Sequence, residues 1–117
     1  MNAQLRITFR HLESSPAVER KITERAAKLE TYYDRIVSCH VIVEAPHRRH
    51  HQGGLFHVRI DLVLPGTTLV VDREPHEHHA HEDVMVAIRD AFDAARRQLE
   101  DYGRRQRAEV KTHTTAG

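Results

Sequence analysis

The sequence predicts an α+β fold in the chain order β-α-β-β-β-α, a four-stranded sheet with two helices packed on one face. Two observations predict it. Apolar residues alternate along four short segments, which is typical of half-buried strands, and they recur at helical spacing along two longer segments. Packing both helical stripes against one sheet face buries them. Neither a repeat nor a linker interrupts this order, so residues 4–107 are expected to form a single domain.

The first strand and the first helix have clear signals. Between Gln4 and Arg10 apolar and polar residues alternate, which turns the apolar side chains to one face. Ser15 followed by Pro16 predicts a helix start, because serine accepts an orphan backbone N–H and proline at the first helical position has no N–H to lose. The helix is expected to end near Asp34, and its buried stripe comprises Val18, Ile22, Ala26, Leu29 and Tyr33.

Three further strands are expected over residues 37–44, 56–64 and 67–72. The Pro65-Gly66 pair predicts the turn between the last two. In the first of these strands Cys39 belongs to the apolar set and is expected to point inward. The opposite, polar sheet face is expected to stay exposed to solvent, carrying Arg6, His40, His57 and Arg59.

The second helix is expected from about Glu82 to Arg105. Acidic residues in its first turn and Arg104 and Arg105 in its last turn suit the helix dipole. Its buried stripe comprises Val84, Ile88, Ala91, Phe92, Ala95, Leu99 and Tyr102. Residues 108–117 are expected to form a disordered tail.

Composition narrows the class of protein. A chain of 117 residues with 39% hydrophobic and 30% charged residues is typical of one soluble globular domain. The first residues lack the apolar stretch of a secretion signal, and a lone cysteine fits a reducing compartment, so the cytoplasm is the expected location. The net charge of +1 is low for a protein that grips RNA. A nucleic-acid role therefore depends on where the charges point.

The first helix places cations on one face. Lys21, Arg25, Lys28 and Tyr32 follow one another at spacings of four, three and four residues, beside the buried stripe. Three neighbouring cations repel one another unless a partner supplies negative charge, which favours phosphate binding. The alternative is a solvated face on which Glu24 and Glu30 offset the repulsion.

The second helix carries the arginines Arg89, Arg96, Arg97, Arg104 and Arg105, followed by Arg107. The planar guanidinium suits bidentate contacts with phosphate. Acidic residues are interleaved with these arginines: Asp90, Asp93, Glu100 and Asp101. An exposed face held by internal salt bridges is therefore the alternative to an RNA-binding face.

Eleven histidines gather mostly in two polar segments. His47, His50 and His51 lie in one, and the second holds His76, His78, His79 and His81. Imidazoles bind zinc, nickel or copper, so a metal- or pH-responsive binding protein is the alternative function. A specific site needs ligands held at fixed angles, which two loops do not supply by themselves. We therefore assign no metal and no other cofactor.

Catalysis has little support in the sequence. It contains no glycine-rich phosphate loop, no nucleophile elbow and no HExxH motif. An inward-pointing Cys39 behaves as a small apolar residue and not as a nucleophile. We therefore expect neither an enzyme nor a small-molecule substrate.

The residues resemble the ribosome hibernation promoting factor family, also called ribosome-associated inhibitor A or ribosomal subunit interface proteins. The resemblance covers roughly residues 4–105. It rests on Ile7-Thr8-Phe9-Arg10-His11-Leu12-Glu13, Pro16-Ala17-Val18, Ala27-Lys28-Leu29-Glu30, Tyr33-Asp34, His81-Glu82-Asp83, Ala87-Ile88 and Arg97-Gln98-Leu99. The predicted order of strands and helices matches that of the family too.

The resemblance implies a protein that binds ribosomal RNA on the small ribosomal subunit near the decoding centre, blocks messenger and transfer RNA, and stores the ribosome in an inactive state. Arg25, Lys28 and Arg97 match positions that resemble the family's RNA-contacting residues, and Lys21 joins them by the helical-face argument. A short form without the family's extra C-terminal domain is implied, monomeric off the ribosome.

This chain also departs from the family pattern. Relatives tend to carry lysines on the second helix where this chain has Ala94 and Asp101. An acid in place of a phosphate-facing cation turns attraction into repulsion, and Arg104 and Arg105 are expected to compensate. The segment 73–80 resembles an insertion, and its histidines have no role in the family that can be transferred.

Overall fold

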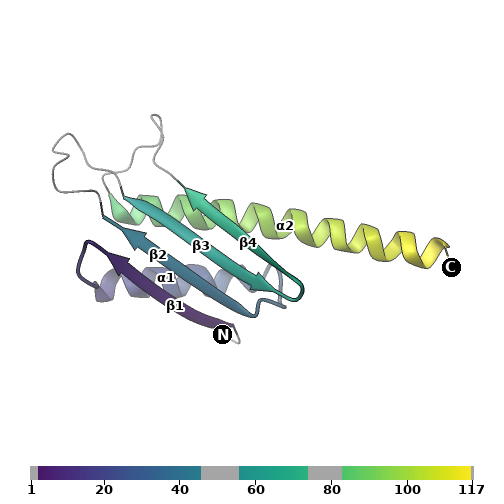
Figure 1. Cartoon of the computed structure of the whole chain (residues 1–117), viewed down its shortest axis with the longest axis horizontal. Coiled ribbons are helices and arrows are strands. Elements are labelled where there is room, and N and C mark those ends of the chain that lie inside the picture. The colour runs from purple at the N-terminus through teal and green to yellow at the C-terminus, as the bar shows by residue number, and fades with distance from the viewer. Residues whose placement is uncertain (1–2, 46–55, 74–82, 117) are drawn as a thin grey trace.

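The computed structural model describes the fold over residues 3–45, 56–73 and 83–116. It confirms the predicted α+β fold: one four-stranded sheet in the order β1-β2-β3-β4, with α1 and α2 on the same face (Figure 1). In the described part of the chain, no helix is long and apolar enough to cross a membrane.

The strands are β1 (Gln4–Arg10), β2 (Ser38–Glu44), β3 (His57–Leu64) and β4 (Thr67–Arg73). β1 and β2 are parallel, and the other neighbours are antiparallel. A parallel pair needs a crossover connection, which α1 supplies. The predicted turn between β3 and β4 is confirmed, and Gly66 takes a φ of +85°, which a residue without Cβ adopts at little cost.

Helix α1 (Pro16–Leu29) begins as predicted, because the Ser15 hydroxyl accepts the Val18 N–H at 3.3 Å and Pro16 opens the first turn. The expected end near Asp34 is wrong, since the helix stops at Leu29. Beyond it the Thr31 hydroxyl donates to the Lys28 carbonyl at 2.6 Å, a local bond that competes with a regular helical ladder. Turns then carry the chain on to β2.

Helix α2 (Val84–Ala116) begins where the Asp83 carboxylate accepts the Met85 N–H at 2.9 Å. The expected end at Arg105 is wrong, because the helix continues to Ala116 through most of the segment where a disordered tail was expected. Neither proline nor glycine occurs between Arg104 and Ala116, and many residues there are good helix formers. The C-terminal part of α2 projects beyond the sheet (Figure 1).

The core lies between the helices and the sheet. The predicted stripes supply it, with Ile22 from α1, Ile60 and Leu62 from β3, and Ile88 and Leu99 from α2 all fully buried. No described helix or strand covers the other sheet face, which carries the polar residues expected there: Arg6, His40, His57 and Arg59.

Candidate nucleic-acid interface

Three cations of α1 lie on one flank of its buried stripe. The stripe separates Lys21, Arg25 and Lys28 from Glu19, whereas Glu24 lies on the cationic flank, 3.6 Å from Lys21. Glu30, just after the helix, accepts the Ala3 backbone N–H at 3.2 Å and so belongs to the side next to β1. Of the two acids expected to offset the cations, Glu30 is therefore turned away from them.

The cationic flank of α1 faces α2. Tyr32 lies beyond Lys28 on this flank, and the Arg96 guanidinium of α2 lies 5.7 Å from the centre of its ring. The two helices run in the same direction along the sheet (Figure 1). The contact between Tyr32 and Arg96 joins the basic flank of α1 to α2. We call the combined set the helical basic surface: Lys21, Arg25, Lys28, Arg89, Arg96, Arg97, Arg104 and Arg105.

Arg96 is held firmly in this contact. A hydrogen bond with Tyr32 raises the pKa of Arg96 above its ordinary value, and the nearby Glu100 and Asp93 carboxylates raise it further. Its Nε is shielded from solvent and has no hydrogen-bond partner among the described residues. The side chain therefore stays charged and lies across the boundary between the two helices.

A second aromatic contact fixes the same boundary. The rings of Tyr33 and Tyr102 meet edge to face, with centroids 5.7 Å apart and planes at 74°. The Tyr33 hydroxyl donates to Gln106 Oε1 at 3.3 Å, and Gln106 Nε2 donates to the Tyr102 hydroxyl at 2.9 Å. Partial burial, followed by the neighbouring Tyr102, raises the pKa of Tyr33. These contacts fix how far α2 is shifted along α1.

Some of the predicted cations are already paired. Lys21 lies 3.6 Å from Glu24, Arg89 lies 3.4 Å from Asp90, and Arg104 contacts Asp101. The salt-bridged alternative for α2 therefore holds for Arg89 and Arg104. These surface pairs contribute little to stability, but they reduce the positive charge that the side chains present.

Besides Arg96, four members of the helical basic surface have no carboxylate within 4.0 Å in the described part of the chain: Arg25, Lys28, Arg97 and Arg105. Arg25 is half-buried and the other three are exposed. Arg97 follows Arg96 by one residue, which turns it about 100° around the helix and away from α1. The contact across the helices is thus made by Arg96, whereas the resemblance had singled out Arg97.

The two departures from the family pattern differ in the structure. Ala94 is buried, with 7% of its surface exposed, so in this chain the position belongs to the core and not to the exposed face. Asp101 is exposed and contacts Arg104. Arg104 therefore does not compensate freely for the acid, as had been expected, and only Arg105 of that pair is without a carboxylate neighbour among the described residues.

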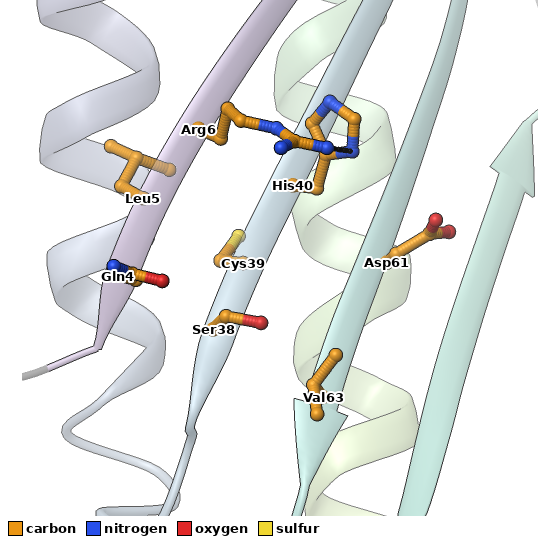
Figure 2. Close-up of a pocket in the computed structure, with 8 residues that line it drawn as sticks. All are labelled: Gln4, Leu5, Arg6, Ser38, Cys39, His40, Asp61 and Val63. Carbon is orange, nitrogen blue, oxygen red and sulfur yellow. Dashed lines mark hydrogen bonds between the residues drawn. The ribbon is translucent and has the colours of Figure 1, made fainter.

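The open sheet face holds a different arrangement, which sequence reasoning missed. His40 Nε2 lies 2.8 Å from the Thr8 hydroxyl. On its other side His40 Nδ1 lies 3.4 Å from Arg6 (Figure 2). Partial burial, followed by the charge of Arg6, lowers the pKa of His40. Arg6 and His40 border a shallow hollow of about 470 Å³ that also reaches Asp61. The parallel pairing of β1 with β2, which the alternating pattern does not specify, brings Arg6 opposite His40.

Farther along this face charges of opposite sign meet. His57 contacts Asp72 and lies 3.7 Å from Glu44, and Arg59 donates to Asp61 at 2.9 Å. The face therefore offers fewer free cations than the helical side.

The histidine candidates are not tested by this geometry. His76, His78, His79 and His81, like His47, His50 and His51, lie outside the described residues. Within the residues the structure does describe, no group of three or more histidine, cysteine, aspartate or glutamate side chains is placed to hold a metal ion. The metal- or pH-responsive function stays a prediction.

Cys39 points into the core, as predicted. It is 3% exposed, and burial raises the pKa of its thiol to about 12, so it is a packed side chain and not a nucleophile. The most distinctive feature of the described surface is thus the set of cations along the two helices.

Comparisons with known proteins identify the family. Residues 5–107 match the family described as Sigma 54 modulation protein / S30EA ribosomal protein, and this chain belongs to it. It is 26% identical over 105 residues to a ribosome hibernation promoting factor of Pseudomonas putida, covering 90% of this chain and 91% of that protein. The factor of the same name from Escherichia coli K12 is 29% identical over 96 residues, 82% of this chain and 88% of that protein.

Solved structures agree on the fold. The N-terminal domain of Protein Y from Thermus thermophilus aligns with a TM-score of 0.66 at 24% identity, over 87% of this chain and 99% of that one. A ribosomal subunit interface protein from Coxiella burnetii aligns with a TM-score of 0.69 at 19% identity, over 86% and 97%. The family is a non-enzymatic, ribosome-associated one that takes part in ribosome hibernation, which confirms that the chain is not an enzyme.

Proposed function

We propose that this chain binds ribosomal RNA of the small subunit near the decoding centre through its helical basic surface, and keeps messenger and transfer RNA out. Residues 4–107 act as one ribosome-binding domain, monomeric off the ribosome, in the cytoplasm and without a cofactor. The family membership supports the ribosome as the partner.

One observation carries the choice of surface: the cations of α1 gather on the flank that meets Arg96 of α2. A molecule with a net charge of +1 attracts RNA poorly as a whole. Arg25 and Lys28 have no carboxylate within 4.0 Å among the described residues, and Glu30 is turned toward β1, so this flank has a positive field despite the balanced total. Phosphate is the ligand that such a side recognises.

The mechanism is steric. No covalent step is needed, because a folded domain bound in an RNA-lined channel excludes other RNA from the same space. The affinity depends on phosphate contacts, since these release counterions, and it falls steeply as salt rises.

Co-sedimentation in a sucrose gradient tests the surface. A variant carrying Arg25→Glu, Lys28→Glu and Arg97→Glu is expected to leave the small-subunit fraction, and to lose its inhibition of translation in a cell-free reaction. The matched control reverses the same number of charges on the open sheet face, with Arg6→Glu, Arg10→Glu and Arg59→Glu. If the control is released and the helical variant stays bound, the proposed surface is wrong.

A further inference from the structure

We infer that Tyr32 is a stacking platform for an unpaired nucleobase, so that the helical basic surface prefers single-stranded RNA to a continuous duplex. This inference rests on the proposed function and deepens it, because it names the kind of RNA that the surface recognises. It concerns a residue that the charge pattern alone leaves without a role.

The Tyr32 ring is exposed to solvent beside the cationic flank of α1. With 44% of its surface accessible, it is one of three exposed large hydrophobic residues in the described part of the chain. Its neighbour Tyr33 takes the packing role, since it meets Tyr102 at the helix boundary. The fold therefore does not need the Tyr32 ring for its core.

The ring is held in position from one side. The Arg96 guanidinium lies over it, 5.7 Å from the ring centroid. A cation over one part of the ring fixes its orientation, and the exposed remainder stays accessible to a ligand. Because the side chain is already ordered, a stacking partner loses less conformational freedom when it binds.

Two cations precede Tyr32 on the same flank of α1. Lys28 lies four residues and Arg25 seven residues before it, and the helix ends three residues before Tyr32. Neither has a carboxylate within 4.0 Å among the described residues. Stacking on an aromatic ring beside a cationic track is how single strands are bound without sequence preference.

The same arrangement disfavours a duplex. Inside a duplex each base is covered on both faces by its neighbours, so none reaches Tyr32 unless it leaves the stack. A duplex would contact the phosphate-binding cations alone. The ring therefore adds affinity for loops, bulges and ends, and adds none for paired helices.

The experiment uses the full chain and three fluorescently labelled probes in anisotropy titrations. The probes are a single-stranded RNA, the same strand with abasic sites in place of its bases, and a blunt duplex of equal length. Tyr32→Ala is compared with Tyr32→Phe, which keeps the ring. The control Val70→Ala removes a side chain of similar exposure, 43%, from the open sheet face. Circular dichroism verifies that each variant is folded.

Tyr32→Ala is expected to weaken single-strand binding by about 5- to 150-fold, which corresponds to the ~1–3 kcal/mol of one base–aromatic stack. Its affinities for the abasic strand and the duplex should match the wild type. Tyr32→Phe should stay within about threefold of the wild type on the single strand, because the stack is kept. Val70→Ala should change none of the three affinities.

Two results would overturn the inference but not the proposed function, provided that the Arg25, Lys28 and Arg97 charge reversals still abolish binding. The first is a Tyr32→Ala variant whose affinity for the single strand is unchanged. The second is a Tyr32→Ala variant that loses as much affinity for the abasic strand as for the single strand. If the wild type binds none of the three probes even at low salt, the proposed function fails and the inference with it. The two failures are therefore distinguishable.

Discussion

Replacing Arg25, Lys28 and Arg97 with glutamine is expected to flatten the salt dependence of binding to the small subunit. Each of these side chains lacks a carboxylate within 4.0 Å in the described chain, so each is free to displace a phosphate counterion. Each phosphate contact contributes about 0.7–0.9 to the slope of log affinity against log salt. Removing three contacts should lower the slope by about 2.1–2.7.

Over a fourfold rise in salt, the wild type should therefore lose about 20- to 40-fold more affinity than the triple variant. The assay is fluorescence anisotropy of labelled protein titrated with purified small subunits at several salt concentrations. Single and double variants should lower the slope in steps. The reasoning would be refuted if the triple variant kept the wild-type slope. It would also be refuted if Arg6→Gln and Arg10→Gln on the sheet face lowered the slope equally.

Three further predictions concern the scaffold. Ile22→Ala should lower the free energy of unfolding by about 2–5 kcal/mol in urea titrations, because Ile22 is fully buried; a loss below about 1 kcal/mol would contradict the core assignment. Cys39, with a thiol pKa of about 12, should resist a thiol-specific reagent until the chain unfolds, whereas rapid labelling of the folded protein would show that the strand opens. The pKa of His40 is lowered below its ordinary 6.5, so the imidazole binds a proton more readily in the unfolded state than in the folded state. The free energy of unfolding should therefore fall as the pH drops below 6.5. His40→Gln should lose less stability than the wild type between pH 7.5 and pH 5.5, and an equal loss would remove His40 as a cause.

The strands and the start of α1 could be predicted from the sequence, because their signals are local. Alternation assigns each strand residue to a face, and the Ser15-Pro16 pair fixes the first helical turn. Helix ends were less accurate. The end of α1 depends on the hydrogen bond from Thr31 to the Lys28 carbonyl, which competes with a continuing helix that the periodic pattern favours equally well.

The site could be predicted only as sets of residues on single helices. Spacing within α1 groups its cations, but the contact between Tyr32 and Arg96 depends on how far α2 is shifted along α1. That shift is set by packing such as the meeting of Tyr33 with Tyr102. Likewise, the buried position of Ala94 follows from the width of the packed face of α2, which a family pattern of lysines does not reveal.

Directed hydroxyl-radical cleavage of ribosomal RNA tests the central claim most directly. An iron chelate is attached to a new cysteine on exposed α1, Ala27→Cys, or on the open sheet face, Thr68→Cys; the native thiol is buried and should not react. With the protein bound to small subunits, strong cleavage near the decoding centre is expected from position 27 and weaker cleavage from position 68. Stronger cleavage from position 68 would show that the sheet, and not the helical basic surface, meets the RNA.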